Sequence, residues 1–558
     1  MRSKWLVLVV VLVIASMVLG ACKKAPEAPG QTLRINLGSY PDIIDPQKSS
    51  FVNEIAHLQL MYEGLTKLNT ALETVPGAAE KWEYNADATE VTFTLRENLK
   101  YSDGTLLNAK RFEYSLLRNI NPATAGEYAA ITDDIKGAGA WRGADLTTAT
   151  EEQLAALKAG VAVQALDTDG NPCTDYEQKD CLILKVGTEG PAPYIHTVLS
   201  LWVVFPAKEE VIATDPDTWW TVAANHIGNG PFILTNLEAN NVANFTPNPN
   251  YWGGFGKVNL EYRYITDSAV AFEAYKNGEF DIVGLAAEDL ATVQADEVLS
   301  KEAMIYAGSC TYGLMMHQLK EPFTDQKVRE AFATALDRES WVRDVLNGLG
   351  KPALTWIPPG FPGFDAEEAR FAYDPEAARA LLAESTYGSA ENLPEVTLTF
   401  SDSPRNRTRY EWLAAKYNEV FGIEIPLNPV ESTTYTALTK DVNTNPQMYI
   451  LGWCADYPDP QNWLSVYWKT GAFGERAGFG NAELDAMLNA ADRELDPAKR
   501  MQLYAEAQTF LTSLSPVAWF WNNVNTYMVK PYVKNLTTTP MDSGWAGIYS
   551  ALDITIEK

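Results

Sequence analysis

The residues that most often perform catalysis are few and far apart in this sequence. Its four histidines, His57, His196, His226 and His317, are scattered along 558 residues. The chain contains no GxSxG nucleophile elbow, HExxH zinc motif, phosphate-binding loop or GxGxxG dinucleotide loop. None of its 72 acidic residues stands out as half of a general acid–base pair. The residue types therefore favour binding over catalysis, and they predict no cofactor.

The five cysteines are distributed as structural residues rather than as metal ligands. Cys173 and Cys181 flank a short polar loop and could staple a hairpin. If Cys22 carries lipid, Cys310 and Cys454 remain and would pair across the chain. This follows because an even set of cysteines in an oxidising compartment usually forms disulfides. No CxxC spacing occurs, so the sequence predicts no metal site.

The first 21 residues are typical of an export signal. Arg2 and Lys4 precede an apolar run, Trp5–Leu19, which is too short for a comfortable membrane span. The run ends in Leu-Gly-Ala-Cys22, which resembles the bacterial lipobox, whose cysteine is acylated and becomes the new N-terminus. The alternative is an ordinary signal peptide with an incidental cysteine. We predict a signal peptide over 1–21, a lipid-anchored tether over 22–30, and a protein held at the outer face of the cell membrane, in a periplasm or on a cell surface.

Length and charge limit the classes of partner. A chain of 558 residues exceeds one hydrophobic core, so at least two lobes are expected. Its formal net charge of −28 at pH 7 disfavours nucleic acid and anionic lipid surfaces as partners. We interpret the charge mainly as a source of solubility, with a modest bias toward cationic ligands.

Hydrophobic patterning predicts strands that alternate with helices, as in α/β lobes with mixed sheets. The predicted strands include 32–37, 91–95, 258–265, 396–400 and 423–427. The predicted helices include 51–68, 108–118, 269–276, 327–347, 375–384 and 409–421.

Several sequence blocks, in order, resemble family 5 of the bacterial extracellular solute-binding proteins, which includes the oligopeptide- and dipeptide-binding proteins. The resemblance covers about residues 32–556. The blocks are FTLRENLKYSDGTLLNAKRFEYSLLR at 93–118, IGNGPF from 227, NPNYW from 248, FTDQKVREAFATALDRE from 323 and GWCADYPDP at 452–460.

The resemblance implies a two-lobed α/β fold of the periplasmic-binding-protein type (cluster C), with hinge strands, mixed sheets and an additional domain. It implies a monomer that closes over an oligopeptide and delivers it to the permease of an ABC importer, which a separate ATPase drives. The alternative is the same fold binding an oligosaccharide, a nickel chelate or another small molecule. The implied parts are lobe I at 31–62, 201–307 and 524–558, its additional domain at 63–200, and lobe II at 308–523.

The GWCADY block carries the most specific implication of the resemblance. In the peptide-binding members, the aspartate that matches Asp456 receives the α-ammonium of the ligand, and the matching cysteine pairs with one in a block like Gly-Ser-Cys310. Trp453 and Tyr457 belong to the same block, and Tyr128 aligns with a tyrosine that pairs with the peptide backbone. The alternatives are that Asp456 caps a turn before a proline and that Tyr128 is a core residue.

Departures from the family pattern put the carboxylate end of a peptide in doubt. Ser50 stands where the well-known members carry a glutamate, and Ser432 where they carry a tryptophan. Ile450 replaces an arginine that helps to bind the ligand's carboxylate. A run of polar residues lies where the family places another carboxylate contact, although it could equally be a solvated helix start. Its members are Arg405, Asn406, Arg407 and Arg409.

Overall fold

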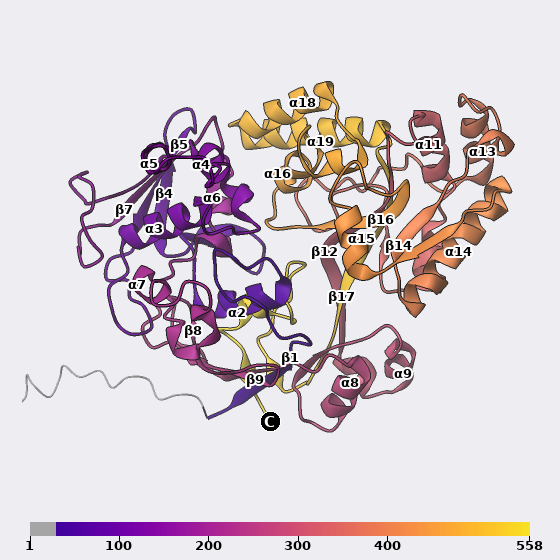
Figure 1. Ribbon diagram of the computed structural model, residues 1–558. Helices are drawn as coiled ribbons and strands as arrows, with labels where there is room; N and C mark the ends of the chain where they lie inside the picture. The colour runs from indigo at the N-terminus through magenta and orange to yellow at the C-terminus, as the bar shows by residue number, and fades with distance from the viewer. Residues whose placement is uncertain (1–29) are drawn as a thin grey trace, which may run out of the picture.

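The computed structural model describes residues 30–558, except for the side chains of Ser432, Thr433 and Thr436, and shows two lobes joined by long strands (Figure 1). The predicted signal peptide, Cys22 and the tether up to residue 29 lie outside the described residues. Within residues 30–558, no helix is long and apolar enough to span a membrane. We call the N-terminal body lobe I, and the body that contains α11 to α19 lobe II.

One large sheet runs through both lobes in the order β15-β14-β16-β12-β17-β11-β1-β10-β9-β8, with β13 (Lys351–Pro352) beside β17. In β1, Leu33 and Ile35 are fully buried, as the alternating sequence predicts. β1 runs parallel to β10 and β11, while β9 is antiparallel to both β10 and β8. The lobe I strands are β1 (Thr32–Asn36), β8 (Phe232–Glu238), β9 (Val242–Pro247), β10 (Asn259–Arg263) and β11 (Ile282–Gly284), and α8 (Ser268–Lys276) packs against β11.

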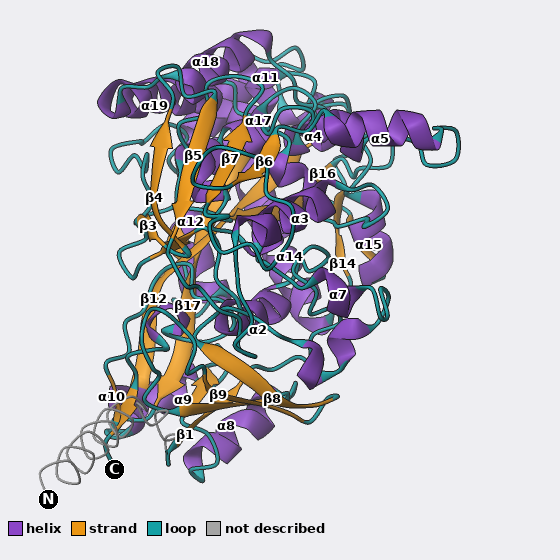
Figure 2. Cartoon of the chain, turned by 90° about the vertical axis from the view of Figure 1, so that its left-hand side faces the viewer, coloured by secondary structure: helices purple, strands orange, loops and turns teal. Residues whose placement is uncertain are grey.

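A second, four-stranded antiparallel sheet forms the outer part of lobe I (Figure 2). Its strand order is β4-β5-β7-β6, and α3 packs against it. Cys173 and Cys181 form a disulfide in the loop between β6 and β7, with Cα atoms 5.7 Å apart, as the sequence predicted. The bounds are β4 (Ala79–Tyr84), β5 (Glu90–Leu95), β6 (Val163–Leu166), β7 (Ile183–Gly187), α3 (Ala109–Ile120) and α5 (Glu151–Ala159).

Lobe II is built on three strands of the large sheet, with helices on its faces (Figure 1). β14 is parallel to both β15 and β16, so the carboxyl ends of these strands lie at one edge of the sheet. The strands are β14 (Leu398–Ser401), β15 (Leu427–Val430) and β16 (Met448–Cys454). The longer helices are α11 (Gln326–Thr334), α13 (Pro375–Ala383), α14 (Pro404–Phe421), α18 (Ala482–Arg493) and α19 (Pro497–Ser513).

Two long antiparallel strands, β12 (Ala303–Met316) and β17 (Val517–Val529), connect the lobes. In Figure 2 they rise from the level of β1 and β9 toward the upper helices. β17 pairs with lobe I strand β11, and β12 pairs with lobe II strand β16. The register of the β12–β17 ladder shifts between Ala307 and Thr311, and this irregularity divides the ladder into two parts. These strands are therefore shared by both lobes.

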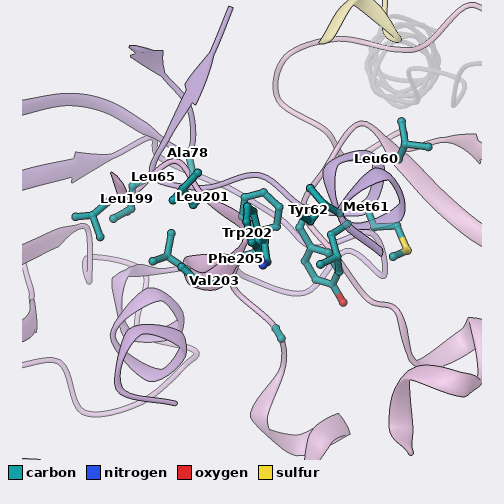
Figure 3. Close-up of a cluster of buried hydrophobic side chains, with 14 of the residues drawn as sticks. Leu60, Met61, Tyr62, Leu65, Ala78, Leu199, Leu201, Trp202, Val203 and Phe205 are labelled. Carbon is teal, nitrogen blue, oxygen red and sulfur yellow. The ribbon is translucent and has the colours of Figure 1, made fainter. Parts of the chain in front are cut away.

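The predicted helix at 51–68 is wrong beyond its first half. The helix α2 (Val52–Met61) ends at Met61. The chain then forms the strand β2 (Thr66–Leu68), because these residues pair with β3 (Thr74–Pro76). The end of α2 lies beside the segment 199–205 in a buried apolar cluster (Figure 3). There the Tyr62 ring stacks on Phe205 with centroids 6.2 Å apart.

Two other predicted elements differ in the structure. The helix expected over 327–347 breaks after Thr334, and the Asp337 side chain caps a new turn by accepting from Ser340 N. A π-helical turn, Trp341–Val345, follows. The strand expected at 423–427 lies instead at 427–430, after Pro426, which has no N–H to donate to a ladder.

Candidate ligand-binding site

The predicted site residues of lobe II gather at the edge where β14, β15 and β16 end. α14 follows β14, with Ser403 as its N-cap, and Asp456 lies two residues beyond the end of β16. Ser432 begins α15 (Ser432–Leu438) after β15, and its side chain lies outside the described part of the chain. Open α/β sheets bind ligands beyond the carboxyl ends of their strands, so this edge is the candidate site.

Asp456 is a half-buried carboxylate held by the buried amide of Asn462. Asn462 Nδ2 donates to Asp456 Oδ2 at 3.0 Å, and Asp456 N donates to Asn462 Oδ1 at 3.1 Å. Desolvation raises the pKa of Asp456 to about 6, although hydrogen bonds from Asn462 and Tyr128 oppose the rise. Asp456 forms no ion pair among residues 30–558, and a desolvated carboxylate of this kind is suited to receive a cationic group.

Lobe I contributes Tyr128 to the same point. Its hydroxyl hydrogen-bonds to Asp456, and the negative charge of Asp456 is the main cause of the raised pKa of Tyr128. The Tyr128 ring packs against Trp202 with centroids 5.2 Å apart. The Ser50 hydroxyl donates to Oε2 of Glu127, the residue before Tyr128, at 2.7 Å. The structure therefore brings Asp456 and Tyr128 together between the lobes, and it places Ser50 against the residue that precedes Tyr128.

The two aromatic residues of the GWCADY block have different environments. The Trp453 indole donates to Asn462 Oδ1 at 3.2 Å, and its ring packs against Phe473 at 4.9 Å between centroids. Tyr457 is 1% exposed, bonds to Gln461 and packs in the core cluster of lobe I. Tyr457 therefore joins the lobes by packing rather than by facing open space.

Most of the polar run at the start of α14 is already paired. Arg405 forms an ion pair with Glu288 of lobe I, and Arg407 pairs with Asp402 at 2.7 Å. Asn406 Nδ2 donates to the carbonyl of Ser401 at 2.8 Å, which fastens the helix start to the strand before it. These contacts give all three residues a structural role at the site's edge.

A disulfide fixes the strand that carries Asp456. Cys310 of β12 and Cys454 of β16 are opposite each other in the ladder and are joined, with Cα atoms 4.0 Å apart. Two positions along, Tyr312 is opposite Gly452, where a Cβ atom would lie 2.6 Å from Tyr312 Cδ1. Glycine at 452 therefore gives the Tyr312 ring its place beside β16.

Two residues of the site were not predicted from the sequence. Asn462 bonds to both Trp453 and Asp456, and it stands just beyond the matched block. Glu127 is an exposed carboxylate that accepts from Ser50. The only available signal for Asn462 was its place two residues after GWCADYPDP, and Glu127 had no signal besides its neighbour Tyr128.

Among residues 30–558, no group of three histidine, cysteine or acidic side chains is placed to hold a metal ion. A cavity of about 840 Å³ lies within lobe I, lined by α3 and α5 residues that include Tyr114, Leu117 and Lys158. Asp456 is not among its lining residues, and we locate the candidate site by the side chains at the sheet edge instead.

Comparison with known proteins identifies the family. The family described as bacterial extracellular solute-binding proteins, family 5 (middle region), matches residues 73–475. The chain belongs to this family. Family 5 consists of solute-binding proteins, which confirms the prediction that the chain is not an enzyme.

Family 5 relatives and solved structures match the chain along nearly its whole length. The dipeptide-binding protein DppE of Bacillus subtilis is 27% identical over 543 residues, which cover 94% of each chain. A probable deoxycholate-binding periplasmic protein of Escherichia coli, YgiS, is 28% identical and covers 91% of each chain. The solved structure of Haemophilus influenzae OppA in complex with RPPGFSPFR has a TM-score of 0.73 at 22% identity and covers 95% of this chain and 100% of that one. The predicted fold class is therefore confirmed.

Proposed function

We propose that this protein captures oligopeptides between its two lobes by binding their α-ammonium group at Asp456. The observation that carries the proposal is a desolvated carboxylate without an ion pair, which Asn462 orients from one lobe and Tyr128 touches from the other. A charged hydrogen bond in a water-poor site is stronger than a neutral one. An amino terminus is the one positive group that every unmodified peptide carries, so this contact accepts peptides regardless of sequence.

The rest of a peptide needs contacts that ignore side-chain identity. Strand-like hydrogen bonds to the peptide backbone have this property. The name of DppE as a dipeptide-binding protein supports the same class of ligand. Delivery to the permease of an ABC importer, with an ATPase acting indirectly, completes the proposed function.

A non-peptide solute is the second candidate. YgiS is named as a probable deoxycholate-binding protein, and deoxycholate carries no ammonium group. Ile450 also stands where peptide-binding members have an arginine. We favour a peptide because an uncharged or anionic solute would leave the charge of Asp456 unbalanced.

A double substitution of protein and ligand tests the proposal. Asp456→Asn keeps the shape but removes the charge, so peptide binding should weaken by roughly ten- to several-thousand-fold, as expected from the loss of about 2–5 kcal/mol at a buried charge pair. N-acetylation of the peptide should cost the wild type a similar factor and the variant little more. Calorimetry on the four combinations measures this coupling. Equal binding of free and acetylated peptide by the wild type would point to the second candidate.

We also propose that Cys22 carries a lipid that tethers the protein outside the membrane as a monomer. The lipobox-like sequence at 19–22 supports this. We further propose that the chain divides into lobe I at 31–62, 201–307 and 524–558, the additional domain at 63–200, and lobe II at 308–523. Cys22→Ser should move the protein from the membrane fraction to the soluble fraction. A wild-type protein that is soluble without detergent and has no lipid mass on its N-terminal peptide would contradict the tether.

A further inference from the structure

The cavity of about 840 Å³ in lobe I has the size of a small-molecule site. Pockets that bind organic molecules in proteins usually have volumes of about 300–1,000 Å³. Residues of α3, α4 (Ala138–Arg142), α5 and α7 (Glu209–Ile212) line this cavity. All its lining residues lie between positions 48 and 217, and Asp456, Tyr128 and Ser50 are not among them. The peptide site therefore does not account for this cavity.

The two ends of the cavity differ in charge. In both views α4 and α5 lie above α3, and α7 lies below it (Figures 1 and 2). At the α7 end, Lys48 shares the cavity wall with the carboxylates of Glu209 and Asp217, and its Nζ donates to the carbonyl of Pro216 at 3.4 Å. At the end formed by α4 and α5, Lys158 is the only charged side chain of the described chain that lines the cavity. This end is therefore the cationic one.

Lys158 has no carboxylate partner. Its Nζ lies 5.9 Å from the centroid of the Trp141 ring, and it forms no ion pair within residues 30–558. Glu113 of α3 also lines the cavity, but it pairs with Lys110 at 2.6 Å and accepts from Ala165 N at 3.1 Å. An anionic ligand would therefore meet a lysine that no carboxylate of the protein neutralises, and it could form a charged hydrogen bond with it.

Three polar groups at the cavity also lack hydrogen-bond partners. Trp141, Thr124 and Tyr114 line the cavity, and the indole N–H and the two hydroxyls form no hydrogen bond within the described residues. Trp141 is 4% exposed and Thr124 is 9% exposed. Because buried polar groups in proteins normally have partners, these groups indicate a ligand that offers acceptor atoms.

Much of the remaining wall is apolar. Leu117 of α3 lines the cavity together with Val161, Val163 and Ile212, and the last three are 6–7% exposed. Such a wall stabilises an apolar molecule, because contact with it removes the surface of that molecule from water. The ligand that fits therefore has an apolar body and, near Lys158, an anionic acceptor group.

We propose that this cavity is a second ligand site, which binds a small molecule with an apolar body and one carboxylate. The carboxylate pairs with Lys158 and accepts from the indole N–H of Trp141. The apolar body lies along α3 toward Ile212. This site is independent of peptide capture at Asp456, so either proposal can fail without the other.

The test uses decanoate, below the concentration at which it forms micelles. Decyltrimethylammonium, which has a chain of similar length and the opposite charge, is the control ligand. Calorimetry should show that the wild type binds decanoate at a single site and at least about tenfold more tightly than the cation, as a charged hydrogen bond to Lys158 predicts. Lys158→Gln should remove most of this preference. The matched control, Lys301→Gln, changes an exposed lysine of α10 (Leu299–Glu302) and should leave the preference unchanged.

Filling the cavity tests where the acid binds. Ala155 and Ala156 are both exposed on α5, but only Ala155 lines the cavity. Ala155→Trp should abolish decanoate binding, whereas Ala156→Trp should keep the wild-type affinity. Asp456→Asn should also bind decanoate as tightly as the wild type does.

A wild type that does not bind decanoate, or binds it no better than decyltrimethylammonium, would overturn the inference. Decanoate binding that survives both Lys158→Gln and Ala155→Trp would also overturn it. So would decanoate binding that is lost in Asp456→Asn, because that result places the acid between the lobes.

Discussion

At the scale of single residues, the negative charge of Asp456 that ligand binding requires lowers the stability of the folded protein. Its pKa rises from the ordinary value of 3.8 to about 6 because the folded protein desolvates it. The folded state therefore holds the proton more tightly than the unfolded chain does. Stability from this group is fully present below about pH 4, decreases as the pH rises toward 6, and is absent above that. The charge that the ligand needs is destabilising at neutral pH.

Asp456→Asn should consequently change stability in a pH-dependent way. The variant's Tm, relative to that of the wild type, should be more favourable at pH 7.5 than at pH 4, by about 1–3 °C for a chain of this size. Comparing the two pH values isolates the part of the effect that depends on protonation of Asp456, to which desolvation and the hydrogen bonds from Asn462 and Tyr128 both contribute. Thermal melts of ligand-free protein measure the difference. A constant difference in Tm across this range would mean that Asp456 is not desolvated.

The sequence identified residues of the site, but it did not predict which of the charged residues form ion pairs with one another. Asp456, Tyr128 and Ser50 were candidates because of the family resemblance. The structure brings Asp456 and Tyr128 together and places Ser50 against Glu127. Nothing in the sequence separated Arg407, which is paired, from Arg409, which forms no ion pair among residues 30–558, since their difference depends on whether a carboxylate lies within reach. For Arg405, the partner Glu288 is 117 residues away and belongs to the other lobe.

At the scale of elements, local patterns predicted β14 and α14 from residue 409 onward, but they missed the first five residues of α14 and the strands that join the lobes. α14 has the local signals of a helix start, with Ser403 as N-cap and Pro404 next to it. β12 and β17 have weaker signals. Gly308 and Ser309 interrupt the apolar sequence pattern of β12. The sequence of β17 changes from a buried apolar half to the more polar Asn522–Tyr527. β12 and β17 form because they pair with strands that are distant in the sequence. A local sequence pattern does not contain information about such pairing.

Gly452→Ala tests whether the packing of β16 against β12 positions the site. The new methyl group would lie 2.6 Å from Tyr312 Cδ1, so the ring must shift from Trp521. Overpacking of this kind costs about 1–3 kcal/mol. We expect a lower Tm and weaker peptide binding. The control is Gly284→Ala in β11, where a Cβ meets no atom within 4 Å. Equal effects of the two substitutions would contradict the packing argument.

At the scale of the whole molecule, the lobes also touch away from Asp456. The Arg500 guanidinium of lobe II lies 5.2 Å from the centroid of the Tyr194 ring in lobe I, and Gln461 Nε2 donates to the Tyr194 hydroxyl at 3.4 Å. Leu68 and Leu72 of lobe I pack against the lobe II core that contains Trp356. Contacts that form only when the lobes meet stabilise the closed arrangement without contacting the ligand. They therefore influence affinity through the population of closed protein.

Leu68→Glu should favour separation of the lobes. A charge at this position must leave water to pack against the apolar core of lobe II, so the closed arrangement becomes less populated. The apparent affinity falls by the same factor as the closed population, which we expect to be about tenfold. Small-angle scattering should show a larger radius of gyration, and saturating peptide should restore the wild-type value. The matched control, Leu146→Glu, changes a lobe I leucine that is already 47% exposed and should alter neither quantity. If Leu68→Glu leaves both the radius of gyration and the affinity unchanged, the contact at Leu68 does not help to hold the lobes together, and closure depends on the contacts around Asp456 and Tyr194 instead.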